Sequence, residues 1–379
     1  MRAGRWIESY RIVSRAYFHL PLVAVFLLMN GYQPLQIAFM LALYGVVAAL
    51  ADLGLGWLKG RLTLAGSLVV GESIKVVGLL LMVVDVQWGF VAASQILSGV
   101  GFSLTAGVDG ALASSLRGRE TAAAQESRTQ MGMFLISFAA AVLGAFALLV
   151  WDRLPFLLSA LAALVSMGLV LAARLPLRDS RERTAVPRSR GRGPGVDAKT
   201  RFWAMYYSLN RALLLSSYTF LIPLLLFGAY RISIVLFGVL MGIYTLLGLV
   251  AARLSPRLAG KPVLFVFSSV GLVLGIALLL GDGAVFAACA LAALGISGGF
   301  VRPATMISLT PALERVDADQ RVRILRGLER NQGLLQAVLL LASGVSLTMF
   351  SSIEITISGY LAICVILQIA AGVVFMKNR

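Results

Sequence analysis

Apolar runs of about 18 to 25 residues follow one another along nearly the whole chain, separated by short polar breaks. Each run is long enough, at about 1.5 Å per residue in a helix, to cross about 30 Å of hydrocarbon. The apolar positions within a run are continuous and do not alternate with polar ones, which favours helices over strands. A helix satisfies its own backbone hydrogen bonds in lipid. The pattern therefore predicts an all-α integral membrane protein.

The polar breaks define twelve predicted transmembrane helices. They lie near residues 12–31, 34–58, 63–84, 87–113, 124–150, 154–175, 202–228, 232–254, 262–281, 284–310, 324–350 and 353–376. One long hydrophilic stretch, rich in Pro, Gly, Ser and Arg, separates the sixth helix from the seventh and is typical of a flexible linker. We therefore expect a six-helix bundle over 1–175, a linker over 176–200 and a second six-helix bundle over 201–379.

The composition supports the bilayer as the solvent of this chain. Of its 379 residues, 59% are hydrophobic and 13% are charged, and the mean hydropathy is +0.90. Soluble domains carry about 25% charged residues. The two cysteines, Cys289 and Cys364, lie within apolar runs, where we expect them to be small packing residues. We expect no metal and no cofactor.

Basic residues are concentrated in alternate loops. The net charge is +16, and most Lys and Arg residues fall in the segments that share one side of the membrane with both termini. The loops of the other side carry only Arg153 and Arg231. This asymmetry is the positive-inside pattern. It places both termini in the cytoplasm at a plasma membrane, expected to be a bacterial inner membrane, and it accounts for the net charge without nucleic-acid binding.

Two short patterns recur at an offset of about 200 residues. Residues 126–130 (Glu-Ser-Arg-Thr-Gln) open the fifth predicted helix, and residues 329–332 (Glu-Arg-Asn-Gln) open the eleventh. Residues 99–102 (Gly-Val-Gly-Phe) lie in the fourth helix, and residues 298–300 (Gly-Gly-Phe) lie in the tenth. These matching positions indicate that the two halves are repeats, an organisation that is common in secondary transporters.

Three segments carry motifs of a known family. Residues 52–61 read Asp-Leu-Gly-Leu-Gly-Trp-Leu-Lys-Gly-Arg, between the second and third predicted helices. Residues 95–111 read Gln-Ile-Leu-Ser-Gly-Val-Gly-Phe-Ser-Leu-Thr-Ala-Gly-Val-Asp-Gly-Ala, and residues 320–327 read Gln-Arg-Val-Arg-Ile-Leu-Arg-Gly. These segments resemble, in a degenerate form, the signature motifs of an exporter-like subgroup of the major facilitator superfamily. The resemblance implies two six-helix bundles around a central cavity that helices 1, 4, 7 and 10 line.

The chain also departs from the pattern of this family. Asp52 and Arg61 stand where the loop motif has its acid and its arginine, but Gly60 replaces the loop aspartate. Gln95 stands where many proton-driven antiporters of the family carry an arginine, and residues 139–145 lack the Gly-Pro motif of many exporters. The resemblance therefore implies a transporter and leaves its coupling mechanism open.

Ionisable side chains within the predicted helices are candidate functional groups, because one at mid-bilayer costs at least about 2.5 kcal/mol. Arg211 lies about ten residues into the seventh helix, roughly 15 Å deep, beside Asn210 and one turn after Tyr206 and Tyr207. We predict that these four residues contact the substrate and that Arg211 is the principal contact. A structural ion pair between Arg211 and an acid on a neighbouring helix is the alternative.

Five other polar or aromatic side chains are candidate substrate contacts: His19, Gln95, Tyr244, Arg302 and Gln336. His19 is the only histidine, and an unperturbed histidine titrates near neutral pH. Arg302 lies in the Gly-rich tenth helix. The alternatives are a hydrogen-bonded structural role for His19 and a snorkelling, interfacial position for Arg302.

Eight charged residues are candidates for coupling or gating. Glu72 and Lys75 share one face of the third helix and are expected to neutralise each other, with proton coupling as the alternative. The others lie toward the cytoplasmic helix ends or in the loop motif, and clusters of them are expected to hold those ends together. They are Asp52, Asp109 and Arg128 in one half, Glu329 and Arg330 in the other, and Arg61 in the loop.

Central cations outnumber central acids in the predicted helices, since Glu72 is the only central acid. We therefore predict a secondary active transporter, more an exporter than an importer, for a small amphipathic organic molecule that is anionic or zwitterionic. A proton or another ion is the expected coupling partner, membrane lipids surround the chain, and we expect a monomer. The alternatives are proton-coupled multidrug efflux of lipophilic compounds and a transport-dead sensor or scaffold. Enzymatic chemistry is not expected, because the chain has one histidine and no triad, zinc-protease or nucleotide-binding motif.

Overall fold

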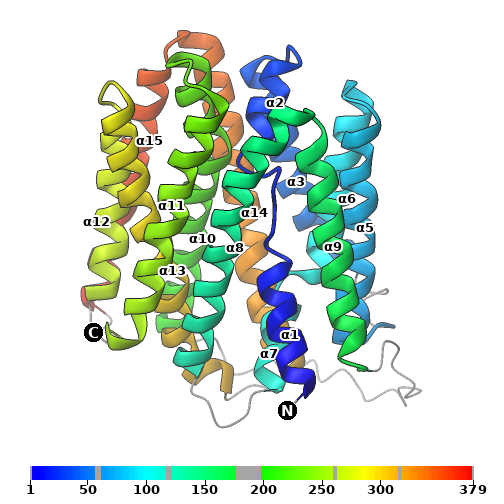
Figure 1. Ribbon diagram of the computed structural model, residues 1–379. Helices are drawn as coiled ribbons and strands as arrows, with labels where there is room; N and C mark the ends of the chain where they lie inside the picture. Colours follow the sequence, from blue (N-terminus) through cyan, green and yellow to red (C-terminus); the bar gives the residue numbers. More distant parts are fainter. Residues whose placement is uncertain are drawn as a thin grey trace.

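The computed structural model describes residues 2–55, 61–116, 122–175, 198–258, 263–314 and 318–377. In these ranges the chain is almost entirely helical, and the helices stand side by side in one bundle (Figure 1). Ten of the described helical stretches are long and apolar enough to cross a membrane, and a shorter apolar helix, α12 (Val263–Leu278), adds one more crossing. Two short helices in succession form the first crossing. The predicted architecture of twelve helices in two six-helix halves is confirmed.

The crossings follow the order of the chain. The first six are α1 (Arg2–Val13) with α2 (Val23–Met29), α3 (Pro34–Gly54), α5 (Leu64–Val84), α6 (Trp88–Thr105) with α7 (Val108–Ser115), α8 (Ala122–Val150) and α9 (Leu154–Ala172). The second six are α10 (Ala198–Ser216) with the π-helical segments η1 (Ser217–Leu221) and η2 (Leu224–Ala229), α11 (Ile234–Leu254) with η3 (Ser255–Leu258), α12, α13 (Ala284–Glu314), α14 (Ala318–Phe350) and α15 (Ile353–Lys377). Helix α1 begins and α15 ends at the same end of the bundle, which we call the terminal end (Figure 1).

The predicted linker over 176–200 lies largely outside the described residues. Its last part, 198–200, belongs to α10. Residues 56–60 of the loop motif, which include Gly60, also lie outside the described ranges.

The first crossing is not the continuous helix that hydropathy predicts over 12–31. Helix α1 ends at Val13, α2 begins at Val23, and residues 14–22 between them form turns and irregular backbone. Pro21 lacks a backbone donor and disfavours helix at the residue before it. The irregular segment packs against α8 at Gly144, where a Cβ would collide with the carbonyl oxygen of Phe18. Hydropathy misses the break because most of these residues are apolar.

Two further crossings depart from regular α-helix. The fourth is divided into α6 and α7 at Ala106 and Gly107, and Gly107 has a left-handed backbone with φ of 71°. A Cβ at Gly107 would also lie 2.8 Å from the backbone nitrogen of Arg326 in α14, so sterics and conformation both require glycine. In the seventh crossing, η1 and η2 are wound as π-helices, a geometry that is frequent at functional sites.

The two halves pack along α3 against α14 and along α8 against α11. Midway along the first pair, a Cβ at Gly45 would lie 2.6 Å from the carbonyl oxygen of Gly333. Toward the end opposite the terminal end, a Cβ at Gly344 would lie 2.6 Å from the Cβ of Ala38. Lipid provides little hydrophobic force between helices, so these small residues stabilise the contact by permitting close van der Waals packing.

Replacing Gly45 with Ala should destabilise the protein, because the added methyl group must displace the backbone of α14. Overpacking of this kind costs about 1–3 kcal/mol. Gly168 in α9 is the matched control, since a Cβ there meets nothing within 4 Å. Thermal unfolding of the purified variants in detergent should show a lower melting temperature for G45A and little change for G168A. Equal melting temperatures would contradict the close α3–α14 contact.

Candidate functional site

A cavity of about 240 Å³ lies between the two halves, in the middle of the bundle. Its wall is formed by the irregular segment 14–22 with α3, α5, α6, α8 and α9, and by α10, η1, α11, α13 and α14. Drug-sized ligands occupy larger pockets of about 300–1,000 Å³. The cavity therefore suits a small organic molecule.

The charged residues of the wall are mostly basic. Arg15, Lys75, Arg211 and Arg302 line the cavity, whereas Glu329 is the one acidic residue among its described lining residues. Arg211 and Arg302 were predicted from their depth in the sequence. Arg15 was missed, because in the sequence it is the last basic residue of the polar N-terminal segment, and only the break after Val13 brings it to the cavity.

Arg211 differs from the other three cations in having no counter-charge. Its Nε atom is buried without a hydrogen-bond partner, and no described carboxylate lies within 4.0 Å of its guanidinium group. The other three cations each lie within 4.0 Å of a carboxylate oxygen. The alternative of a structural ion pair for Arg211 is therefore not supported by its surroundings.

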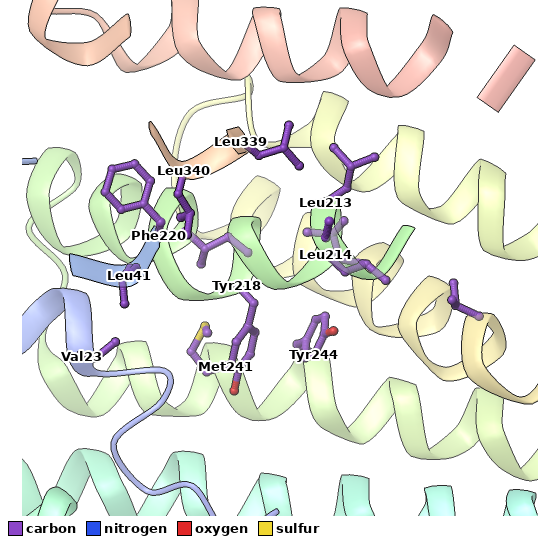
Figure 2. Packing of buried hydrophobic residues seen from close by; sticks show 14 of the residues in the cluster. Val23, Leu41, Leu213, Leu214, Tyr218, Phe220, Met241, Tyr244, Leu339 and Leu340 are labelled. Carbon is purple, nitrogen blue, oxygen red and sulfur yellow. The ribbon is translucent and has the colours of Figure 1, made fainter. Parts of the chain in front are cut away.

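Aromatic side chains cover much of the apolar wall. The rings of Tyr218 and Tyr244 lie 4.8 Å apart on the second half, and Figure 2 shows them side by side. On the first half, the rings of Tyr44 and Phe102 lie 5.8 Å apart. All four residues line the cavity, and Tyr244 is one of the predicted contacts. They offer apolar surface, with a hydroxyl group on each tyrosine.

Four glutamine side chains add neutral polar groups to the wall: Gln95, Gln130, Gln332 and Gln336. Gln332 donates from Nε2 to Oε1 of Gln336 at 3.3 Å. The Oε1 atom of Gln130 is buried without a partner. Gln95 and Gln336 were predicted, whereas Gln130 was noted only as part of the repeated pattern. Each free amide group can bind a donor or an acceptor of a bound molecule.

His19 also lines the cavity, from the irregular segment of the first crossing. Ser159 of α9 holds it, since the Ser159 hydroxyl lies 2.9 Å from His19 Nδ1 and accepts the His19 backbone N–H at 3.3 Å. The ring of Phe156 lies 5.3 Å from the imidazole ring. The predicted site role and the predicted structural hydrogen bond are thus both compatible with its position.

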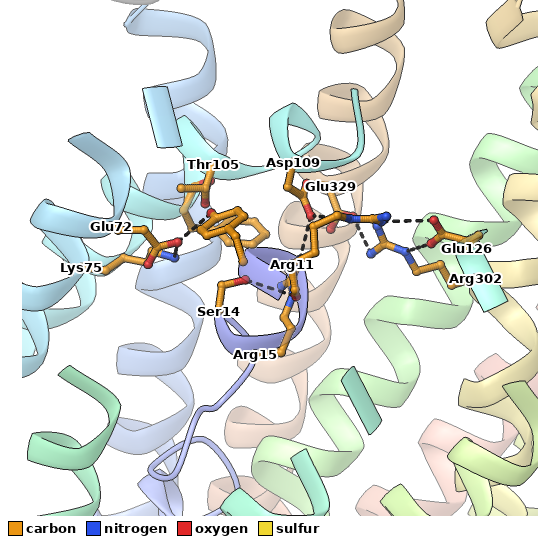
Figure 3. Close-up of polar contacts among 12 residues, drawn as sticks. Arg11, Ser14, Arg15, Glu72, Lys75, Thr105, Asp109, Glu126, Arg302 and Glu329 are labelled. Carbon is orange, nitrogen blue, oxygen red and sulfur yellow. Dashed lines mark hydrogen bonds and ion pairs between the residues drawn. The ribbon is translucent and has the colours of Figure 1, made fainter. Parts of the chain in front are cut away.

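An ionic network closes the cavity toward the terminal end (Figure 3). Arg302 of α13 binds Glu126 of α8 at 2.8 Å and approaches Glu329 of α14 at 3.8 Å. Arg11 of α1 binds the other oxygen of Glu126 at 3.1 Å and lies 3.5 Å from Asp109. Because Glu126 belongs to the first half and Arg302 to the second, this network joins the halves. Arg302 is buried within it and does not snorkel.

Further polar contacts join the halves at the same end. Arg330 of α14 lies 3.4 Å from Asp52 of α3. The Ser127 hydroxyl of α8 donates to the carbonyl oxygen of Ala252 in α11 at 2.8 Å. At the opposite end the contact is apolar, and α2 packs against η1 and η2, with Val23 and Phe220 visible in Figure 2. The halves therefore touch on both sides of the cavity.

The predicted cluster of Asp52, Asp109 and Arg128 does not form. Asp52 pairs across the halves as described, and Asp109 faces the arginines of the first crossing. Arg128, with an exposed side chain, instead pairs with Glu8 of α1 at 2.7 Å. The three residues lie on different helices that face different partners, a feature that spacing along the chain does not show. Arg61 is exposed on the turn before α5.

The predicted pairing of Glu72 with Lys75 is present. Lys75 Nζ lies 2.6 Å from Glu72 Oε1, which also accepts the hydroxyl of Tyr10 at 2.8 Å. Both charged side chains are buried, and of the two only Lys75 lines the cavity. The pair is satisfied within the first half.

Three predicted contacts lie outside the cavity wall. Tyr206 bonds to the hydroxyls of Ser268 and Ser269 in α12, and Asn210 accepts from Gln368 of α15 at 2.9 Å. Tyr207 donates to Glu329 at 2.9 Å beneath the cavity. Sequence proximity to Arg211 was misleading, because neighbouring residues of a helix point to different sides. Tyr206, Asn210 and Tyr207 support the helices that surround the site.

A sequence model of the Major Facilitator Superfamily matches residues 14–316 of the chain. The chain belongs to this superfamily. It is therefore a multi-pass membrane transporter, and transporters of this superfamily carry small-molecule substrates. No curated protein sequence matches the chain.

Solved structures of other transporters have the same fold. Two crystal structures of the nucleoside transporter NupG, one of a point mutant, align with the present chain with a TM-score of 0.72 and 12% identity. The alignments cover 99% of the present chain and 99% of each NupG chain. The crystal structure of a bacterial homologue of the iron transporter ferroportin, in an outward-facing state, aligns with a TM-score of 0.69 and 17% identity over 100% of this chain and 99% of its own. At such identities the similarity establishes the fold alone.

Breaking the network at the terminal end should destabilise the transporter. R302Q leaves Glu126 and Glu329 with one cation fewer, and removal of one partner from a buried ion pair costs about 3–5 kcal/mol. The double variant E126Q/R302Q should lose less than the sum of the single losses, because both charges are removed together. R128Q is the control, since its pair with Glu8 is exposed and contributes about 0–1 kcal/mol. Melting temperatures that are additive in the double variant would contradict a direct Glu126–Arg302 interaction.

Proposed function

We propose that this transporter carries a small organic anion, or a zwitterion whose acidic group is free to bind, by alternating access, and that it works as an exporter. The single observation that carries the proposal is the unpaired guanidinium group of Arg211 in the wall of the cavity. A charge removed from water without a partner is strongly unfavourable. A negatively charged group on the substrate is the partner that this site lacks.

The rest of the wall supports the same class of substrate. Four basic residues and one acidic residue line the cavity, so its potential favours anions. Tyrosine, phenylalanine and glutamine side chains accommodate a molecule with an apolar body and further polar groups. Lipophilic cations, the usual cargo of multidrug efflux, are less suited, because Glu329 already interacts with Arg302 and Tyr207.

The orientation follows from the distribution of exposed basic residues. Arg5, Arg128, Arg201, Arg253 and Arg257 are exposed toward the terminal end of the bundle. We therefore place this end in the cytoplasm, in a bacterial inner membrane. On this proposal the halves 1–175 and 201–379 move as units of a monomer, with a proton or another ion as the coupling partner. Export is proposed because the motif segments resemble those of an exporter-like subgroup of the superfamily, although residues 139–145 lack the Gly-Pro motif of many exporters.

Loss of Arg211 should weaken the binding of anions strongly. Purified protein is screened by thermal shift against anionic, zwitterionic and cationic metabolites and antibiotics at two pH values. A hydrogen bond to a charged group contributes about 1.5–3 kcal/mol, so R211A should weaken binding of a stabilising anion about 10- to 150-fold. R201A, a change at an exposed arginine of the same helix, is the control.

The same anion should then accumulate in proteoliposomes that contain wild type or R201A, and accumulation should be lost with R211A. Stabilisation by lipophilic cations alone would contradict the proposal and favour drug efflux. Anion transport that is unchanged in R211A would also contradict it.

A further inference from the structure

The charges around the cavity can be balanced one against another. In the described part of the chain, the basic side chains that line the cavity or join its ion pairs are Arg11, Arg15, Lys75, Arg211 and Arg302. The carboxylates that join the same pairs are Glu72, Asp109, Glu126 and Glu329. Five cations face four anions, and one positive charge is left over.

The pairing assigns the excess charge to one residue. Lys75 belongs to Glu72, while Arg11, Arg15 and Arg302 share Asp109, Glu126 and Glu329. Only Arg211 stands apart from these pairs among the five. His19 does not alter the balance, because its imidazole ring is hydrogen-bonded to a serine hydroxyl and has no described carboxylate within 4.0 Å. The cavity therefore holds one unit of positive charge that no described carboxylate compensates.

We infer that the cavity selects organic molecules with one net negative charge, whose acidic group binds Arg211. This inference rests on the proposed function and narrows it. A monoanion makes the filled cavity neutral, a dianion leaves one negative charge buried, and a zwitterion or neutral molecule leaves the positive charge in place. Because uncompensated charge is unfavourable in a site that excludes water, the monoanion is bound most tightly.

The first experiment measures the excess charge without any substrate. Purified R211M and R211Q should melt above wild type at low ionic strength in a buffer free of organic anions. A gain of about 1 kcal/mol raises the melting temperature by about 2–4 °C in chains of about 150–250 residues, and we expect a somewhat smaller rise in this longer chain. K75M and R302M should melt below wild type, because each leaves a buried carboxylate without its cation. If the melting temperatures of R211M and R211Q fall as far as that of K75M, the charge of Arg211 is compensated within the protein and the inference is wrong.

An internal counter-charge provides a second variant. Leu215 lines the cavity four residues after Arg211, on the same face of α10. L215E should keep the melting temperature of wild type, because the added carboxylate pairs with Arg211, and it should prevent binding of anions. L215E/R211M should melt well below L215E, since the carboxylate then lacks a partner. Equal melting of these two variants would contradict an available charge at Arg211.

The second experiment varies the charge of the ligand on one ring: benzamide is neutral, benzoate carries one negative charge and terephthalate carries two. Thermal shift and calorimetry should show that wild type binds benzoate about tenfold or more tightly than either of the others. E329Q removes the acidic group of the cavity wall and raises the excess positive charge from one to two. It should therefore shift the binding preference from benzoate toward terephthalate by a similar factor.

The outcomes separate this inference from the proposed function. Tighter binding of terephthalate by wild type would overturn the selection of monoanions and leave an anion transporter in place. Equal binding of benzamide and benzoate, or no measurable binding of either acid, would overturn the role of the Arg211 charge in binding an acidic group. Preference for benzylammonium, tested alongside, would overturn the proposed function as well.

Discussion

Charge buried inside the bundle must be compensated there, because hydrocarbon offers no water to solvate it. This constraint accounts for the closure at the terminal end, where Arg302 of the second half binds Glu126 of the first at 2.8 Å. It also accounts for the buried Lys75–Glu72 pair at 2.6 Å. Arg211 is the position at which the described chain does not meet the constraint. The fold and the recognition of substrate therefore depend on the same quantity, which is the local balance of charge.

The break in the first crossing follows from this constraint and from backbone hydrogen bonding. Irregular backbone at membrane depth is tolerated where it lines a cavity or is buried in protein. Residues 14–22 meet both conditions, since Arg15 and His19 reach the cavity while Ser159 binds the His19 backbone N–H. Arg11 and Arg15 both approach Oδ2 of Asp109, at 3.5 and 3.8 Å, but after the break at Val13 only Arg15 lines the cavity. Arg11 remains in the ionic network beneath, and Arg15 contributes to the wall above.

Hydropathy recovers most of the fold from the sequence. Each apolar residue adds its own transfer free energy, and the sum over about twenty residues identifies a transmembrane helix. The position of Arg211 near the middle of the seventh crossing is recovered in the same way. The break over 14–22 is not recovered by hydropathy, because it depends on the missing side chain of Gly144 in another helix. Pairs such as Asp52 with Arg330 also depend on which helices meet. The repeated pattern came nearest to the site, because Glu126 and Glu329, its equivalent acids, both approach Arg302.

Occupancy of the cavity and closure of the bundle are linked through Arg211. When either end opens, water reaches the guanidinium group and solvates it, so an empty open state tolerates the unpaired charge. When both ends close, the charge is desolvated, and a bound anion then stabilises the occluded state more than it stabilises the open ones. A ligand shifts a conformational equilibrium only by such a difference in affinity. On the proposed function, the unpaired arginine therefore makes the loaded transporter close more readily than the empty one, which is the condition that alternating access requires for obligatory exchange or coupled export.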